Sequence, residues 1–281
     1  MTVGQVLVLA IVQGLCELLP VSSSAHVIVA EKLMGLDPTA PEMTLLLVML
    51  HTGTMFAVIG YFWSEWKASW FASRQAFLGF AKLVVIATAF TGIVGLALLL
   101  LIERVAMRGH AHPEVEQLFG NVRLIATGLT AAGVLIIVSS LRARRARRAE
   151  LAAGPAAWIG AVQGLCIPFR GFSRSGATIS TGLIAGIDKA TAESFSFALA
   201  IVLTPPAIAR EAWRLVRAHS VSATPGVLSH LFAPSLAGMV LSFVAGWLAL
   251  KWLSRWLERG MWYVFGIYCI VAAAALLAFA S

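Results

Sequence analysis

The chain has 281 residues, of which 59% are hydrophobic and 12% are charged, and its mean hydropathy of +0.87 argues against a soluble globular protein. Three cysteines in apolar surroundings argue against a disulfide framework and against a C-x-x-C metal or redox site. The net charge of +8 is better explained by orientation in a membrane and attraction to anionic headgroups than by nucleic acid, so no nucleic-acid partner is expected.

The first apolar stretch, residues 1–30, is interrupted in its middle. Pro20 stops it, three consecutive serines and His26 follow, and Glu17 lies just before the break. A carboxylate at hydrocarbon depth is costly, so Glu17 indicates a functional site; the alternative is a structural acid paired with a buried arginine. Because irregular backbone inside a membrane needs protein or a watery cavity around it, we predict a re-entrant hairpin of two half-length helices.

Six further apolar stretches are long enough for transmembrane helices, which need about 20 residues. They cover residues 43–64, 83–102, 124–141, 190–209, 231–250 and 260–281. The fourth is predicted as a span although it contains Glu193 and the pair Pro205 and Pro206.

The chain repeats its first motif 150 residues later, because residues 162–166 match residues 12–16 letter for letter (VQGLC). The second copy also runs into a break, which contains Ser173, Arg174 and Ser175. Two broken, serine-bearing segments at corresponding places in two halves are the best sequence pointer to a midplane site between repeats. The first copy carries an acid and an imidazole and the second a guanidinium, so we predict one shared site with complementary charges.

The densest basic cluster lies in residues 142–148, and the positive-inside rule makes this loop cytoplasmic. Counting outward places the N-terminus outside, with a mild conflict from the basic residues in 210–217. Three predicted spans separate the two breaks, and an odd number inverts the second copy. We therefore expect an all-α integral membrane protein with an inverted-topology repeat, six transmembrane helices and two re-entrant broken helix hairpins. It would form a single membrane domain, with repeat one at about 1–141, a cytoplasmic loop at 142–150 and repeat two at about 151–281.

The first break combines an acid, an amide and an imidazole. Glu17 stands one helical turn after Gln13, so the two side chains could hold a hard divalent cation or position a water. His26 is interpreted as a general acid or base or as a nucleophile, with a packing histidine as the alternative. His51, in the next span, could be a partner of the site, although packing is the favoured interpretation.

The serine run allows two compatible roles. Ser22, Ser23 and Ser24 are expected to cap the second half-helix, and a helix N-terminus is also an anion site. At most one of them would be a nucleophile, and it would need His26 to activate it.

The second break is typical of a phosphate cradle. Gly171 allows close backbone approach, Ser173 and Ser175 offer hydroxyls, and Arg174 can bind an anion through two N–H groups. Arg170 adds a second cation, either for the phosphate or for lipid headgroups. A phosphate or diphosphate ester with a hydrophobic tail fits a site of this composition inside a membrane.

These motifs resemble the undecaprenyl-diphosphate phosphatase family, the bacitracin-resistance type of integral membrane phosphatase. The family pattern (E/Q)-x-x-x-E matches residues 13–17, and the pattern L-P-x-S-S-S/T-x-H matches residues 19–26. The pattern P-G-x-S-R-S-x-x-T matches residues 171–178, except that Arg170 replaces its first proline. The likeness covers nearly the whole chain. The arginine in place of proline changes the stiffness of this loop and adds a positive charge to it.

The resemblance implies hydrolysis of undecaprenyl diphosphate to the monophosphate and inorganic phosphate, with dependence on Mg²⁺ or Ca²⁺ and resistance to bacitracin. It implies a multi-pass protein of the bacterial cytoplasmic (inner) membrane with its active site open to the outer (periplasmic) face. Matched by position, Gln13 and Glu17 would serve the metal and the water, and Ser23 and His26 the phosphoryl transfer. The diphosphate would be bound by Ser173, Arg174 and Thr178.

The expected site is therefore divided into two sets. The catalytic residues are Glu17, His26, Ser23 and Arg174, and the substrate-binding residues are Ser173, Ser175, Thr178, Gly171, Arg170, Ser22 and Ser24. Three nucleophiles stay open, namely Ser23, His26 and an activated water. The expected partners are a polyprenyl diphosphate and membrane lipids, with a homodimer as an open option. The main alternative is a flippase that carries a polyprenyl phosphate across the bilayer, because inverted repeats with broken helices are also the architecture of secondary transporters.

Overall fold

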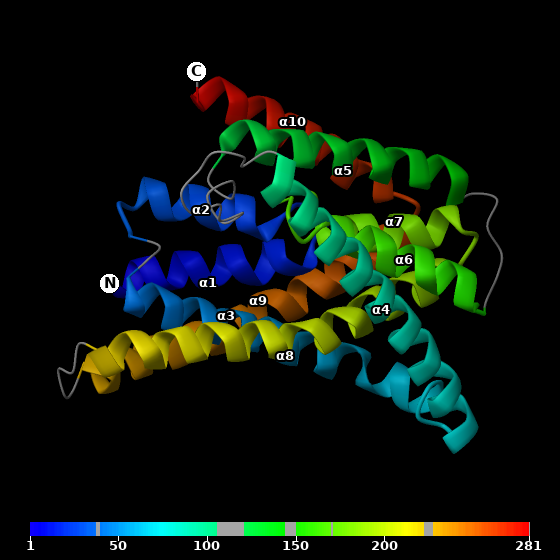
Figure 1. Ribbon diagram of the computed structural model, residues 1–281, viewed down its shortest axis with the longest axis horizontal. Coiled ribbons are helices and arrows are strands. Elements are labelled where there is room, and N and C mark those ends of the chain that lie inside the picture. Colours follow the sequence, from blue (N-terminus) through cyan, green and yellow to red (C-terminus); the bar gives the residue numbers. More distant parts are fainter. Residues whose placement is uncertain (38–39, 106–120, 144–149, 170, 222–226, 281) are drawn as a thin grey trace. The chain divides into compact units, whose positions relative to one another are not determined.

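The structure is a computed structural model, and it describes residues 1–37, 40–105, 121–143, 150–169, 171–221 and 227–280. Within these ranges the regular elements are helices and no strand is present, which confirms the all-α prediction. The order is α1 (Val3–Leu18), α2 (Ser23–Leu33), α3 (Pro41–Ala68), α4 (Arg74–Val105), α5 (Val122–Ala143), α6 (Ala153–Leu165), α7 (Arg174–Ile184), α8 (Lys189–Val221), α9 (Val227–Glu258) and α10 (Trp262–Ala280) (Figure 1).

Five of these helices are long and apolar enough to cross a membrane, among the described residues. They are α3, α4, α5, α8 and α9, and each contains one of the predicted spans. The sixth predicted span forms α10, which falls in a shorter class of apolar helix together with α1. In α4 only 17% of the apolar stretch is buried inside the protein, so most of its hydrophobic side chains face outward, as they do when lipid is the solvent. The chain is a multi-pass membrane protein, and the count of six spans stays a prediction.

The chain divides into two compact units. Unit 1 comprises Met1–Leu19, Ser23–Trp63 and Ala200–Leu253. Unit 2 comprises Pro20–Ser22, Ser64–Leu199 and Ser254–Ser281. Both units are built from separated stretches of chain, so each depends on contacts between residues that are far apart in the sequence.

Unit 1 is built around α1, α2 and the first part of α3. Thr2 starts α1 with a reciprocal cap, in which its hydroxyl accepts from the Gln5 backbone and the Gln5 side chain accepts from the Thr2 backbone. The hydrophobic core lies where the three helices meet, and it contains Val6, Leu9, Ala10, Val27, Met43, Leu46 and Leu50.

Close glycine contacts pack α1 against α9 within unit 1. A Cβ built on Gly14 would lie 2.6 Å from the Cβ of Ala245 and 2.8 Å from the carbonyl oxygen of Ser242. Such distances leave no room for a side chain, so glycine is required for the helices to approach this closely.

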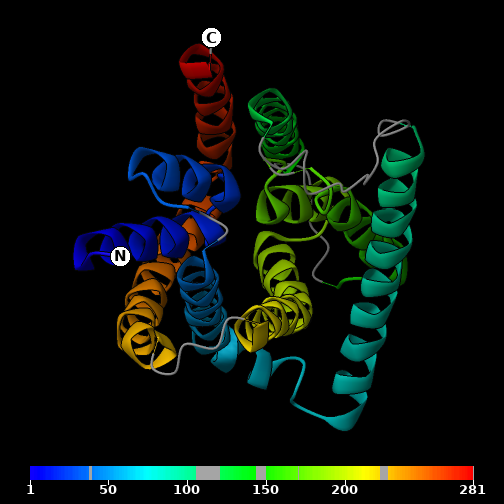
Figure 2. The ribbon, with the colours of Figure 1, turned by 60° about the vertical axis from the view of Figure 1, so that its left-hand side comes forward.

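Unit 2 uses the same device between α6 and α4, which cross in Figure 2. A Cβ on Gly164 would lie 2.8 Å from the carbonyl oxygen of Thr91 and 2.9 Å from the Cβ of Val94. A Cβ on Gly160, one turn earlier, would collide with the Ala87 backbone. The core of this unit contains Val84, Ala87, Ala156, Ile159, Phe195 and Leu199.

The helices α5 and α10 run side by side in unit 2 (Figure 1) and meet at a pair of glycines. A Cβ on Gly133 would lie 2.7 Å from the carbonyl oxygen of Gly266, and a Cβ on Gly266 would lie 2.7 Å from that of Gly133. Each residue thus contacts the other in the same way, as residues do across a local two-fold axis.

The glycine packing generates a test of stability. We expect Gly164→Leu to destabilise the protein by about 1–3 kcal/mol, because the added side chain would overlap α4. The matched control is Gly92→Leu on α4, where nothing lies within 4 Å of a built Cβ. Thermal unfolding of the purified protein in detergent measures both, and equal melting temperatures for the two variants would contradict the assignment of α6–α4 packing.

Candidate active site

The first helix break lies between Leu18, the last residue of α1, and Ser23, the first of α2. Leu19 is extended, with φ −70° and ψ 149°. Ser22 has φ 66°, the left-handed region that a non-glycine residue adopts at a cost of about 1–2 kcal/mol. Backbone strain of this kind is concentrated at functional sites. The break predicted at Pro20 is confirmed.

The Glu17 carboxylate is the centre of the polar groups around this break. Its Oε2 atom accepts a hydrogen bond of 3.2 Å from Gln13 Nε2 and one of 2.6 Å from Ser23 Oγ. Gln13 is 1% exposed and the Glu17 side chain is 16% exposed. The carboxylate is thus held from both sides of the break, by the helix that carries it and by the helix that follows. Gln13 and Glu17 lie together as their spacing predicts.

His51 of α3 also faces this carboxylate. Its Nδ1 lies 2.8 Å from the carbonyl oxygen of Leu47. A carbonyl only accepts, so Nδ1 carries a hydrogen, and Nε2 is the atom that lies 3.9 Å from Glu17 Oε2. The sequence left two roles open for His51, packing and partnership with the site, and this distance is consistent with the second. An ionisable side chain in an apolar span was the signal that pointed to it.

The three serines of the first break differ in their positions relative to α2. Only Ser22 precedes α2, while Ser23 and Ser24 lie in its first turn. Ser23 donates its hydroxyl hydrogen to Glu17. His26 follows Ser23 by three residues, which places both on one face of α2.

The second break lies between Leu165, the last residue of α6, and Arg174, the first of α7. Ser173 caps α7, and its hydroxyl accepts from the Gly176 backbone N–H at 3.3 Å. Gly171 has φ +107°, and a Cβ there would collide with the carbonyl oxygen of Ile125. The space that this glycine leaves is therefore occupied by the chain's own backbone. Arg170 lies outside the described residues.

Thr178 connects α7 to α8. Its hydroxyl donates to the carbonyl oxygen of Arg174 at 2.8 Å and lies 2.5 Å from the hydroxyl of Ser196. Because Thr178 has one hydroxyl hydrogen, Ser196 is the donor in the second contact. Both residues are fully buried. Ser175, also buried, lies in the first turn of α7.

The tip of the first break packs against the start of α7. Residues Pro20–Ser22 belong to unit 2, and a Cβ built on Gly176 would lie 3.2 Å from the Cβ of Pro20. The Cys269 thiol of α10 donates to the carbonyl oxygen of Pro20 at 3.2 Å. Two segments that are about 150 residues apart therefore meet, as the repeated motif predicts.

The two copies of the motif differ in chemistry. Gln163, the counterpart of Gln13, donates through Nε2 to Thr91 Oγ1 at 3.1 Å. The position that corresponds to Glu17 is Ile167. Only the first copy therefore offers a carboxylate, and the second offers the arginine.

The donors around Glu17 suit a hard cation better than a soft one. No group of three or more His, Cys, Asp or Glu side chains that could hold a metal is found among the described residues. Oxygen ligands lie together here, since the Glu17 carboxylate accepts from Ser23 and from Gln13. Mg²⁺ is usually bound by one or two carboxylates with the remaining oxygens from water and substrate phosphates, so this donor set fits such an ion.

Apolar helices that are long enough to cross a membrane define an integral membrane protein, and a carboxylate lies at the first break between its helices. The sequence profile of the family described as bacitracin resistance protein BacA matches residues 6–275, and the chain belongs to this family. The resemblance of the motifs is thereby confirmed.

Curated relatives match over nearly their full length. The chain is 57% identical to undecaprenyl-diphosphatase 2 of Acinetobacter baylyi, over 98% of this chain and 97% of that protein. It is 35% identical to undecaprenyl-diphosphatase of Desulfosudis oleivorans, over 97% of each. It is also 35% identical to undecaprenyl-diphosphatase 1 of Burkholderia pseudomallei, over 94% of this chain and 92% of that protein.

The buried hydroxyl pair at α7 generates a double-mutant test. Thr178→Val keeps the shape of the side chain but leaves the Ser196 hydroxyl buried without its acceptor, which costs about 1–3 kcal/mol. Ser196→Ala in the same chain should restore part of that loss, because it removes the unsatisfied donor. Thermal unfolding of the wild type, the two single variants and the double variant measures the coupling. If the losses of unfolding free energy in the single variants simply add in the double variant, the contact is contradicted.

Proposed function

We propose that the chain is a membrane phosphatase that hydrolyses undecaprenyl diphosphate to undecaprenyl phosphate and inorganic phosphate. The product would be the lipid carrier of cell-wall synthesis, and the family is described by its resistance to bacitracin. Full-length identity of 57% to a protein named for this activity is the observation that carries the proposal. The flippase alternative is not favoured, because the relatives are named as phosphatases. In addition, translocation does not require a serine hydroxyl that is hydrogen-bonded to a carboxylate, as Ser23 is to Glu17.

Arg174 is proposed to bind the diphosphate. The guanidinium can donate two parallel hydrogen bonds to phosphate oxygens, and the N-terminus of α7 adds backbone N–H groups and the positive end of the helix dipole. The predicted contacts of Gly171, Ser173, Ser175 and Thr178, and those of Ser22, Ser24 and Arg170, belong to this proposal. Electrostatic stabilisation of the kind expected here usually supplies the largest share of the rate in phosphoryl transfer.

Ser23 is proposed as the nucleophile and Glu17 as its base. Their oxygens lie 2.6 Å apart, within the range of nucleophile–base pairs. The Ser23 hydroxyl proton passes to Glu17 as Oγ bonds to the terminal phosphorus, and the bond from that phosphorus to the bridging oxygen breaks. The electron pair leaves with undecaprenyl phosphate. Water then hydrolyses the phosphoserine and releases inorganic phosphate, with His26, one turn along α2, as the general acid–base.

Gln13 and Glu17 are proposed to hold Mg²⁺ or Ca²⁺. When bound, such an ion supplies charge neutralisation of the diphosphate oxygens. Gln13 fixes Glu17 through its amide nitrogen, which is consistent with its amide oxygen as a second hard ligand.

The inverted repeat with six spans and two re-entrant hairpins is proposed as the architecture behind this site. Its support is the mirrored packing of the two copies. Gly14 packs against Ser242, Ala245 and Gly246 of α9, and Gly164 packs against Thr91, Val94 and Gly95 of α4, at the same spacing. The reciprocal contact of Gly133 and Gly266 is what a two-fold relation between α5 and α10 would produce. A single membrane domain of two repeats agrees with these contacts.

The orientation is proposed from charge. The exposed Arg142 at the end of α5, with Arg255 and Arg259 around the end of α9, marks the cytoplasmic end by the positive-inside rule. Location in the inner membrane, an active site open to the periplasmic face and a homodimer are further expectations of this proposal.

The nucleophile has a direct test. We expect Ser23→Ala to lower phosphate release from farnesyl diphosphate by about 10²-fold or more, because the attacking oxygen is lost. Mass spectrometry of the quenched wild-type enzyme should find a phosphate on Ser23. Ser69→Ala, at an exposed hydroxyl away from the site, is the control. A Ser23→Ala enzyme within about tenfold of wild type would exclude the serine mechanism and favour water or His26.

The metal is tested by its removal. Phosphate release by the detergent-solubilised protein should stop in chelator and return on addition of Mg²⁺ or Ca²⁺, because one arginine leaves part of the diphosphate charge uncompensated and the Glu17 carboxylate adds to the negative charge. Isothermal titration of the ion into wild type and Glu17→Gln provides a readout independent of activity. Full turnover in chelator would reject the ion.

A further inference from the structure

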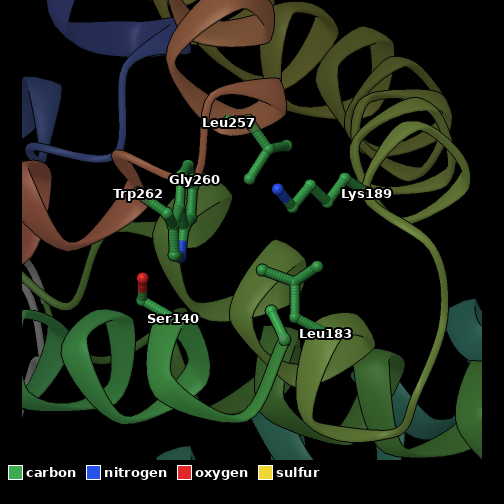
Figure 3. A pocket seen from close by; sticks show the side chains of 7 residues that line it. Ser140, Leu183, Lys189, Leu257, Gly260 and Trp262 are labelled. Carbon is green, nitrogen blue, oxygen red and sulfur yellow. The ribbon is translucent and has the colours of Figure 1, made fainter. Parts of the chain in front are cut away.

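A small cavity lies in unit 2, apart from every residue assigned to the active site. Its volume is about 50 Å³, and it lies among α5, α7, α8, α9 and α10 (Figure 3). The residues that line it are Ser140, Ala143, Leu183, Lys189, Leu257, Gly260 and Trp262. One water needs about 10–15 Å³ of such space, so the cavity has room for a few waters or for one group of the size of a phosphate.

Lys189 supplies the charge in this cavity. Among the described residues that line it, Lys189 alone is charged, and Figure 3 shows its ammonium directed into the space between Leu257 and Trp262. One ammonium hydrogen goes to the carbonyl oxygen of Glu258 at 3.1 Å. An ammonium has three donors, so this contact fixes the position of Lys189 and leaves donors for a ligand.

The remaining walls are mostly apolar. Trp262 donates its indole N–H to the hydroxyls of Ser139 and Ser180, both at 3.1 Å, so the polar atom of the ring is already used. Leu183 and Leu257 complete the apolar surface. A water cluster needs two to four polar partners for each molecule, and these walls offer few. An anionic group, which the Lys189 ammonium can bind, suits the cavity better.

Charged residues of both signs adjoin the residues that line the cavity: Arg142 and Arg259 are basic, and Asp188 and Glu258 are acidic. Arg142 at the end of α5, with Arg255 and Arg259 around the end of α9, is exposed in the same unit. Gly260, with φ +73°, makes the turn that brings α9 and α10 together at the cavity. Basic pockets between transmembrane helices on the cytoplasmic side are typical binding sites for anionic headgroups.

We propose that this cavity binds the phosphate of an anionic phospholipid, with Lys189 as its cationic ligand. The cavity has room for the phosphate group alone, so the glycerol and the acyl chains would lie outside it. The lipid would come from the cytoplasmic leaflet, which follows from the proposed orientation. The site is distinct from the phosphatase site, so lipid binding and phosphate release are measured separately.

The test is native mass spectrometry of the detergent-solubilised full chain titrated with phosphatidylglycerol or phosphatidylcholine. We expect phosphatidylglycerol to bind in preference, and Lys189→Gln to weaken its binding about tenfold, because a hydrogen bond to a charged group is lost. Lys189→Arg should retain binding. Arg255→Gln is the matched control, since it removes an equal charge from an exposed residue that does not line the cavity.

A second variant tests the cavity without changing the charge. Ala143→Leu would fill the space and should also weaken phosphatidylglycerol binding about tenfold, with phosphate release unchanged as the check of folding. Equal weakening by Lys189→Gln and Arg255→Gln, or equal binding of the two lipids, would overturn the proposal in favour of general surface attraction. Competition by inorganic phosphate at equal concentration would show that the cavity binds free phosphate instead.

Discussion

The hydrogen bond of 2.6 Å from Ser23 to Glu17 crosses the first helix break and joins α1 to α2 through a carboxylate. A charge in this position needs partners, and Gln13 and Ser23 supply them from the two helices that the break separates. The break allows the residue that starts α2 to reach the acid of α1.

Glycine makes the helix packing around this site possible. Gly14 and Gly164 remove the side chains that would separate α1 from α9 and α6 from α4, so each broken helix packs closely against a long one. At the second break, the absence of a side chain on Gly171 lets the loop backbone lie directly against the carbonyl group of Ile125. Lipid offers no water to hydrogen-bond the backbone polar groups of an irregular segment. Close packing of protein around the segment keeps these groups away from lipid.

Local patterns in the sequence predicted much of this. The apolar stretches predicted the long helices, Pro20 predicted the first break, and four-residue spacing placed Gln13 beside Glu17. Contacts between distant segments were not predictable in the same way. Neither His51 beside Glu17 nor Thr178 against Ser196 follows from any local period, because both depend on which helix faces which. The roles of the site residues and the identity of the ion stay predictions.

We propose that Glu17 of the first break and Arg174 of the second act on the same diphosphate. A double-mutant cycle on kcat/KM for phosphate release, with Glu17→Gln, Arg174→Lys and the double variant, tests it most directly. Residues that act on one transition state are strongly non-additive, so the account predicts a double variant within about tenfold of the slower single variant. Losses that multiply in full would show two independent sites and contradict the account.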